Sequence, residues 1–278
     1  MPAPQASMMQ NLAKQNFRGK ITLPMDWQQP SGDAGKQYGD AFKPEEKSAV
    51  PKPMCLFKDA SSNKYHVDAA TKVGDKFEKF IDGMCSAICS GWSQWQSLAM
   101  FTGTLHNATV VSALPGNLQG PPLFPLIFAS APKGTAQEMK YSKAIAQAIG
   151  TAWQTWQVGF LATLQCAPHA AFPGPMGPPV PTAPMPVASG SSPGEAGLSD
   201  SALKGMMMGN LGDPQALHQK ELFEAIAKAF KSCFDTWKTS TQMANVMAMG
   251  PIPTFAPPLV PCGPVVCGTN LPIPGVLT

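Results

Sequence analysis

Two cysteines, Cys85 and Cys89, stand four residues apart and would face the same side of a helix, where two thiolates could bind one metal ion. A structural zinc site needs four ligands, and no C-x-x-C motif or neighbouring histidine supplies the others. The seven cysteines, at uneven spacings, also do not match the disulfide framework of a small secreted domain. We expect no metal site and interpret most cysteines as small buried apolar residues. Cys262 and Cys267, in the segment CGPVVC, could still form a disulfide in an oxidising environment.

Catalytic arrangements are the next chemistry to look for. The four histidines are scattered, and none belongs to a Ser/His/Asp, Cys/His or H-E-x-x-H pattern. No G-x-x-x-x-G-K or strand-anchored G-x-G-x-x-G segment could hold a phosphate, and the acids beyond the N-terminal region are too dispersed to pair. We therefore predict a chain that is not an enzyme and takes no cofactor or small-molecule substrate. A hydrolase or binding domain whose site leaves no sequence motif is the alternative.

Three pairs of aromatic residues could instead form a binding platform, because aromatic rings stack on sugars and bases. Their helical phase favours another role, since each pair continues the apolar stripe of a helix, and such residues are usually core or interface. We interpret all six as interface anchors. They are Trp92, Trp95, Trp153, Trp156, Phe234 and Trp237.

The stretches around these pairs can be aligned as three copies of one unit. With Trp92, Trp153 and Phe234 as the reference, the positions 4, 8 and 12 residues earlier are apolar in every copy, and alanine stands 5 residues earlier. These steps mark one face of an α-helix of about five turns. Asp213 and Pro214 indicate a cap near the start of the third helix. The aligned residues are Ile88, Ile149 and Phe230; Met84, Ile145 and Ile226; Phe80, Tyr141 and Leu222; and Ala87, Ala148 and Ala229.

A proline-rich segment follows each helix, at residues 120–123 (GPPL), 177–180 (GPPV) and 256–259 (APPL). Proline fixes φ and lacks an amide donor, so we expect extended straps along a surface and not central strands. The predicted fold is mainly α with long irregular Pro/Gly-rich extended segments, in three helix-plus-extended-strap repeats. Three copies could adopt a pseudo-threefold arrangement on the axis of a threefold or sixfold assembly. The alternative is a pseudo-symmetric monomer unrelated to any axis.

The domain organisation follows from these repeats. Residues 1–74 are predicted to be a polar N-terminal extension, 75–132 repeat 1, 133–194 repeat 2, and 195–278 repeat 3 with a Pro-rich C-terminal tail. The segment 188–195 (ASGSSPGE) separates the second and third copies, and its composition is typical of a flexible connector.

Charge is scarce and unevenly distributed. Only 13% of residues are charged, about half of the roughly 25% typical of soluble domains. Residues 83–132, 144–194 and 239–278, blocks of 50, 51 and 40 residues, contain no Asp, Glu, Lys or Arg. Their Ser, Gln, Pro and Gly residues interrupt any apolar run long enough to cross a bilayer. We therefore expect that protein, from this chain or from neighbouring subunits, covers much of them.

Composition also bears on partners and location. The net charge of +3 comes from dispersed lysines and a single arginine, Arg18, so no dense basic patch predicts a nucleic-acid partner. The N-terminus MPAPQASMMQNLAKQ lacks the apolar core and cleavage site of a secretory signal. We expect synthesis in the cytoplasm and no transmembrane helix; membrane contact is not favoured.

The uncharged helix-plus-strap style of residues 75–278, with FPGPMGPPVPTAPMP and GPIPTFAPPLVPCGPVV, resembles structural proteins of phage tails and contractile injection systems. The resemblance implies a non-enzymatic structural subunit of a large particle, in its baseplate, spike or tube region, with other subunits of that particle as partners. An alternative is a membrane-active or exported effector that inserts its uncharged helices.

Overall fold

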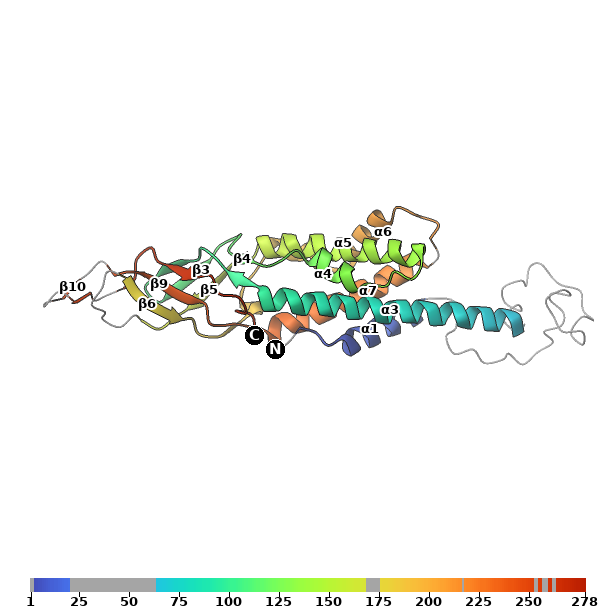
Figure 1. Cartoon of the computed structure of the whole chain (residues 1–278), viewed down its shortest axis with the longest axis horizontal. Coiled ribbons are helices and arrows are strands. Elements are labelled where there is room, and N and C mark those ends of the chain that lie inside the picture. The colour runs from blue at the N-terminus through green and yellow to red at the C-terminus, as the bar shows by residue number, and fades with distance from the viewer. Residues whose placement is uncertain are drawn as a thin grey trace, which may run out of the picture.

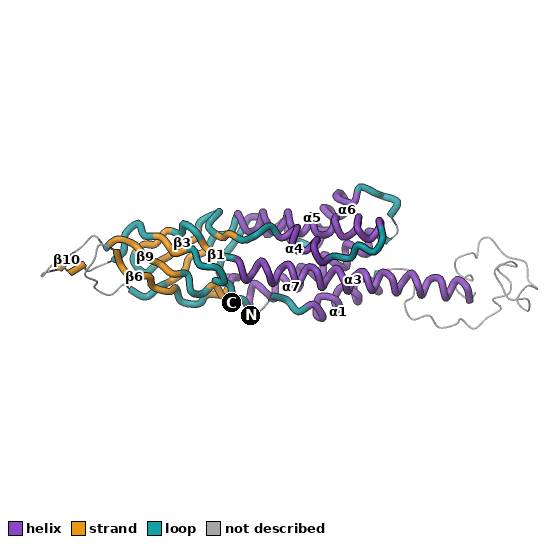
Figure 2. Tube along the Cα trace, in the orientation of Figure 1, coloured by secondary structure: helices purple, strands orange, loops and turns teal. Residues whose placement is uncertain are grey.

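The molecule is long and narrow, with helices in one half and short strands in the other (Figures 1 and 2). The computed structural model describes residues 3–20, 64–168, 176–216, 218–252, 255–256, 260–261 and 264–278. The described chain is mainly α with small antiparallel sheets, which agrees with the predicted fold class at this level.

Three long helices, which we call the central helices, run side by side through the helical half. They are α3 (Lys64–Leu98), α5 (Ala136–Val158) and α7 (Gln219–Ser240). Every residue that the sequence alignment placed on the apolar face of these helices is buried. The helical period therefore identified the buried faces correctly.

The ends of the central helices differ. A capping box starts α5: Thr135 Oγ1 accepts a hydrogen bond from Glu138 N at 3.1 Å, and Glu138 Oε2 accepts one from Thr135 N at 3.2 Å. The predicted cap on α7 is not formed, because that helix begins only at Gln219, after His218 in the left-handed conformation. Asp213 Oδ1 instead accepts a hydrogen bond from Gln215 N at 3.1 Å, within the preceding turn.

Three shorter outer helices fill the grooves between the central helices. They are α1 (Ala6–Arg18), α4 (Leu123–Ser130) and α6 (Asp200–Leu211). The first packs on α3 and α7, the second on α3 and α5, and the third on α5 and α7. Each groove of the described bundle therefore holds one outer helix.

Helix α1 departs from the predicted polar extension. Its residues Met9, Ala13 and Phe17, four apart along one face, are fully buried. Lys14 Nζ lies 2.9 Å from the carboxylate of Asp82 on α3, on the more exposed side. This part of the N-terminal region is thus an integral part of the bundle, while residues 21–63 lie outside the described part of the chain.

Charged side chains join helices across the surface of the bundle. Glu224 on α7 accepts hydrogen bonds from Lys204 on α6 at 2.7 Å and from Lys228 at 2.8 Å. Lys20, just after α1, lies 3.4 Å from the same carboxylate. The two hydrogen-bonded lysines lower the pKa of Glu224 to about 2, so it stays ionised well below neutral pH.

The chain leaves the helical half three times, once after each central helix, and we call these segments the three excursions (100–119, 161–191 and 242–278). Each is closed at its base by an antiparallel pair: Phe101 with Leu118, Leu161 with Ser191, and Met243 with Leu277. The described strands within them are β1 (Met100–Phe101), β2 (Leu105–Asn107), β3 (Val110–Ala113), β4 (Leu118–Gln119), β5 (Ala162–Gln165), β6 (Met176–Pro181), β7 (Met185–Pro186), β8 (Gln242–Met243), β9 (Met247–Pro251), β10 (Phe255–Ala256), β11 (Val260–Pro261) and β12 (Thr269–Leu271).

Antiparallel pairing also connects each excursion to the other two. Strand β3 of the first pairs with β5 of the second, and β6 of the second pairs with β9 of the third. The third returns to the first through His106 and Gly268, which exchange two backbone hydrogen bonds of 2.9 Å. The strand half is therefore closed around its long axis by links between all three excursions.

The proline-rich straps do not share one structure. Residues 120–122 lead directly into α4, which begins at Leu123 with Pro122 as its N-cap. Residues 177–180 lie in β6, at the edge of the sheet β12-β9-β6, where prolines are tolerated. The third strap lies largely outside the described residues. Similar sequence here accompanies different local structure, so the aligned straps are not structurally equivalent.

The predicted flexible connector at 188–195 is ordered and packs on α5. It contributes the short 3-10 helices Val187–Ser189 and Pro193–Leu198. Ser192 Oγ donates a hydrogen bond to the carbonyl of Trp156 at 2.8 Å. Gly194 lies so close to α5 that a Cβ there would be 2.5 Å from the carbonyl oxygen of Thr155. Glycine serves close packing here, not flexibility.

A glycine comparison tests the packing of α4 on α3. A Cβ on Gly91 would lie 2.9 Å from the backbone nitrogen of Ile127, whereas one on exposed Gly209 in α6 would meet nothing within 4 Å. We expect Gly91→Ala to lower the free energy of unfolding by about 1–3 kcal/mol through overpacking. Gly209→Ala should raise it by about 0.5–1 kcal/mol through helix propensity. Urea denaturation measures both, and a stabilising Gly91→Ala would contradict the close approach.

Candidate functional site

The six predicted anchors come together at the axis of the helical half. Trp92, Trp95, Trp153, Trp156, Phe234 and Trp237 are each at most 2% exposed. The ring centroids of Trp95 and Trp153 are 4.7 Å apart, and those of Trp92 and Trp153 are 4.9 Å apart, both edge to face. Trp92 and Trp237, from α3 and α7, lie 5.3 Å apart. Such pairs stabilise beyond the area they bury.

Because the six residues are buried, the interface that they form lies within one chain. They anchor the central helices of one chain to each other, and at most 2% of each side chain is exposed in this conformation. An anchor for another subunit must expose its side chain before binding, which these residues do not. Their assignment as anchors between subunits is therefore replaced by one as anchors within the chain.

Two glutamines next to the tryptophans satisfy buried indole groups. Trp95 Nε1 donates to Gln157 Oε1 at 2.8 Å, and Trp237 Nε1 donates to Gln96 Oε1 at 2.9 Å. Each glutamine directly follows a tryptophan of another central helix and is nearly fully buried. The bonds thus run from α3 to α5 and from α7 to α3, and the buried donors keep an acceptor.

The third equivalent position carries a different residue. Lys238 follows Trp237 where the other copies have glutamine, and its ammonium group donates to both carboxylate oxygens of Glu195 at 2.7 Å. The W-Q dipeptides at residues 95–96 and 156–157 are a sequence signal that would have found these glutamines, because both fall at the same position of the aligned copies. Our sequence analysis did not use it.

Gln157→Leu tests this hydrogen bond. It leaves the buried indole N–H of Trp95 without its acceptor, which should lower the free energy of unfolding by about 1–3 kcal/mol. Gln154→Leu, on the exposed side of the same helix, is the matched control and should change it by less than about 0.5 kcal/mol. Chemical denaturation followed by tryptophan fluorescence gives both values. Equal effects would show that the buried bond contributes little.

One cysteine and one histidine lie close together in the strand half, a pair that the sequence analysis did not find. Cys166 Sγ and His106 Nε2 are 3.3 Å apart, and both residues are buried. His106 Nε2 also lies 2.9 Å from the carbonyl oxygen of Ala108, which can only accept a hydrogen bond. The Nε2 proton therefore points to Ala108, so this nitrogen cannot take the thiol proton.

Burial also keeps Cys166 from acting as a nucleophile. It raises the pKa of the Cys166 thiol, whereas a nucleophilic cysteine needs a lowered pKa and access to substrate. The pair connects the residue after β5 to β2, and we interpret it as structural. Of the other histidines, His218 packs edge to face on Phe77, and the side chains of His66 and His169 lie outside the described part.

Cys85, Cys89 and Cys233 are buried between α3 and α7, as the sequence analysis expected for Cys85 and Cys89. Desolvation raises all three pKa values, that of Cys89 to about 12 and that of Cys233 to about 11. No cluster of three or more His, Cys, Asp or Glu residues in the described part of the chain could hold a metal ion. Cys267 is exposed and reduced, while Cys262 lies outside the described residues, so their disulfide stays a prediction.

Alkylation distinguishes these thiols. At pH 8 a pKa of 11 leaves about 0.1% thiolate, and burial also keeps the reagent from the sulfur. We expect iodoacetamide to label Cys267 at least about 100-fold faster than Cys89 or Cys233 in the folded protein, as mapped by mass spectrometry. In urea all three should react at similar rates. Fast labelling of Cys89 without denaturant would contradict the burial.

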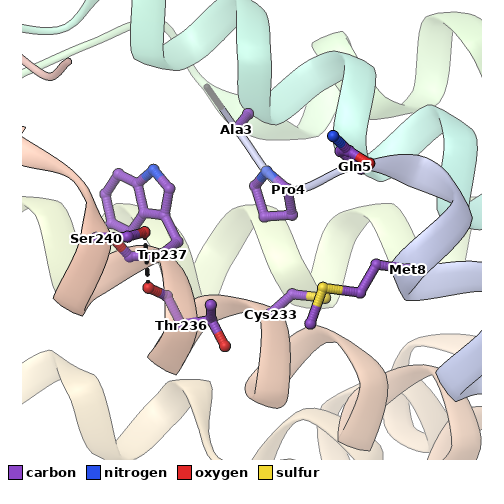
Figure 3. A pocket seen from close by; sticks show the side chains of 8 residues that line it. All are labelled: Ala3, Pro4, Gln5, Met8, Cys233, Thr236, Trp237 and Ser240. Atoms are coloured by element: carbon purple, nitrogen blue, oxygen red, sulfur yellow. Dashed lines mark hydrogen bonds between the residues drawn. The ribbon is translucent and has the colours of Figure 1, made fainter. Parts of the chain in front are cut away.

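A cavity of about 430 Å³ opens between the N-terminal segment and α7 (Figure 3). Its walls are mostly apolar, with Met8 on one side and Cys233 and Trp237 on the other, and no lining residue is charged. The hydroxyl groups of the lining residues Ser240 and Thr236 donate to the carbonyls of Thr236 at 2.8 Å and Ser232 at 3.1 Å. The cavity could hold a small apolar group, but its walls bring no acid and base together.

A larger, shallower groove of about 710 Å³ lies along α4 and α5. Lys143 is its single charged lining residue, among Gln, Thr and apolar side chains. None of the helices in the described part of the chain has the length and apolar character needed to cross a membrane. Comparison with protein-family models, curated proteins and solved structures finds no match to this chain.

Proposed function

We propose that the chain is a non-enzymatic structural subunit of a large multi-subunit particle, built from three copies of one unit around a pseudo-threefold axis. Each unit consists of an outer helix, the central helix that follows it, and one excursion. Unit 1 contains α1, α3 and the first excursion, unit 2 contains α4, α5 and the second, and unit 3 contains α6, α7 and the third. Units 1 and 2 begin one outer helix earlier than the predicted repeats, whereas the predicted repeat 3 (195–278) already contains α6.

The observation that carries this proposal is the cyclic pairing of the excursions. The first pairs with the second, the second with the third, and the third with the first. Buried Asn270 strengthens the last link: its Oδ1 accepts hydrogen bonds from Thr104 N and Oγ1 at 3.0 and 2.9 Å, and its Nδ2 donates to the carbonyl of Phe101 at 2.6 Å. A chain whose three excursions pair in a cycle fits a position on a threefold axis better than a position on one side of a particle.

The helical half supports the same arrangement. Its three outer helices occupy the three grooves between central helices, in the order expected for rotation about one axis. The Trp–Gln bonds follow this rotation too, since a tryptophan of one unit donates to the glutamine of the next, from unit 1 to unit 2 and from unit 3 to unit 1. Three contact types thus follow one symmetry.

The particle that we propose is a phage tail or contractile injection system, in its baseplate, spike or tube region. The resemblance of residues 75–278 to such proteins supports this choice, as does the rod-like shape, which suits a subunit on a threefold or sixfold axis (Figure 1). The chain would be made in the cytoplasm and then become part of the assembled particle.

Fractionation of the producing cells tests the proposal. We expect the chain to sediment with a high-mass particle, at one copy per symmetry axis by quantitative mass spectrometry, and to be visible there by electron cryomicroscopy. A stable free monomer with no particle would refute the structural role. If that monomer also releases dye from vesicles, a membrane-active effector becomes the better interpretation.

A further inference from the structure

The two halves of the molecule differ sharply in charge. The ion pairs found among the described residues all lie in the helical half or at its border with the excursions. None of the three excursions, residues 100–119, 161–191 and 242–278, contains a single Asp, Glu, Lys or Arg. About a quarter of the residues on a free protein surface are normally charged, so an exposed half with no charged residue is unusual.

Exposed apolar side chains gather in the same half. Of the eleven large hydrophobic residues exposed in the described chain, nine lie in the excursions or at the adjoining helix ends. Backbone bonds bring some of these segments together: Gly116 N donates to the carbonyl of Val158 at 2.7 Å, and Gly275 N to that of Ala99 at 3.0 Å. The nine are Leu98, Leu105, Leu114, Val158, Leu161, Met176, Val266, Leu271 and Ile273.

We infer that the strand half is the end of the molecule that enters a protein partner, and that this partner is a trimer whose end forms an uncharged socket. The inference rests on the proposed structural role and adds an orientation to it, with the charged helical half facing solvent. Cores of protein interfaces are depleted in charged residues, because an unpaired charge is costly to desolvate. Uncharged polar groups such as Asn107 and Gln165 can still form hydrogen bonds there.

Other occupants fit the strand half less well. A membrane surface or a nucleic acid is recognised largely through lysine and arginine, and the excursions have neither. Addition of a partner strand is hindered at β6, where Pro178, Pro179 and Pro181 lack amide donors. Three excursions that pair in a cycle surround one axis, and this arrangement suits three identical subunits.

Charge insertion at exposed positions tests this orientation. Leu114→Lys, at a side chain 52% exposed, and Leu271→Lys place an ammonium group on the first and third excursions. Met139→Lys is the matched control, since Met139 is 46% exposed in the helical half. All three lysines would be solvated in the free protein, so the variants should melt at the wild-type temperature. Purified variants are mixed with particles isolated from cells that lack this chain, and the sedimented fraction is measured against concentration.

We expect wild type and Met139→Lys to bind these particles equally, and Leu114→Lys and Leu271→Lys to bind on the order of 100-fold more weakly, because each buries an unpaired charge in the socket. Equal binding by all four proteins, or loss confined to Met139→Lys, overturns the inference and leaves the structural role intact. Wild type that does not bind the particles at all overturns both.

Three further results would name a different occupant. If light scattering shows that wild type is a dimer and that Leu114→Lys is a monomer, the strand half binds a second copy of this chain. Flotation of wild type with vesicles of zwitterionic lipid, lost in Leu114→Lys, would assign it to a membrane. Electron cryomicroscopy of the loaded particle should show the strand half on a threefold axis, and a position off that axis overturns the trimeric socket.

Discussion

Aromatic rings from α3, α5 and α7 fill the space between these helices, and their size sets the geometry of the helical half. Tryptophan is too bulky for three helices to meet backbone to backbone around it, so the helices stand apart and leave grooves on the outside. The outer helices fill those grooves, and glycine permits the closest approach, as at Gly91 and Gly150. In the described part of the chain, the aromatic axis is thus enclosed by three central and three outer helices.

The same packing organises the strand half. The aromatic pairs lie in the last turns of the central helices, so three rigid helix ends stand around one axis at the junction. Each excursion starts and finishes at such an end, and its length can vary while its base stays in place. Residues 161–191 are 11 more than residues 100–119, which accounts for about half of the difference between the separations of the reference positions, 61 and 81 residues; the longer segment that contains α6 accounts for the rest.

The sequence predicts the parts of this fold that depend on local periodicity. The central helices and their buried faces follow from apolar steps of four and three, and the cysteines on α3 are buried as expected. Helix α1 carries the same signal, with apolar residues four apart at Met9, Ala13 and Phe17, inside the region that was predicted to be a polar extension. Strands of two to six residues, several with proline, are too short for the alternating burial seen in β3 and β5 to identify them in the sequence. The contact of His106 with Gly268 spans most of the chain. Pairing of that range depends on tertiary structure.

For the candidate site too, the sequence predicts what depends on local periodicity and not what depends on tertiary structure. Helical phase identified the six anchors as buried. Whether the surface that covers them belongs to the same chain or to another depends on how the chain returns from each excursion to the helical half. At the connector, residues 188–195, composition predicted a flexible segment, but glycine and serine there serve tight packing and hydrogen bonds to α5. Composition alone does not distinguish these uses of glycine.

Lys238, which pairs with Glu195 where the other two helices have glutamine, makes one third of the molecule chemically unlike the rest. A homotrimer presents every surface three times, so any ligand that it recognises can bind in triplicate. Three units joined in one polypeptide need not obey this rule, because each can change its sequence alone. A protein that recognised the surface around Lys238 would bind once per molecule. It would thereby mark one direction around the axis of an otherwise rotationally symmetric assembly.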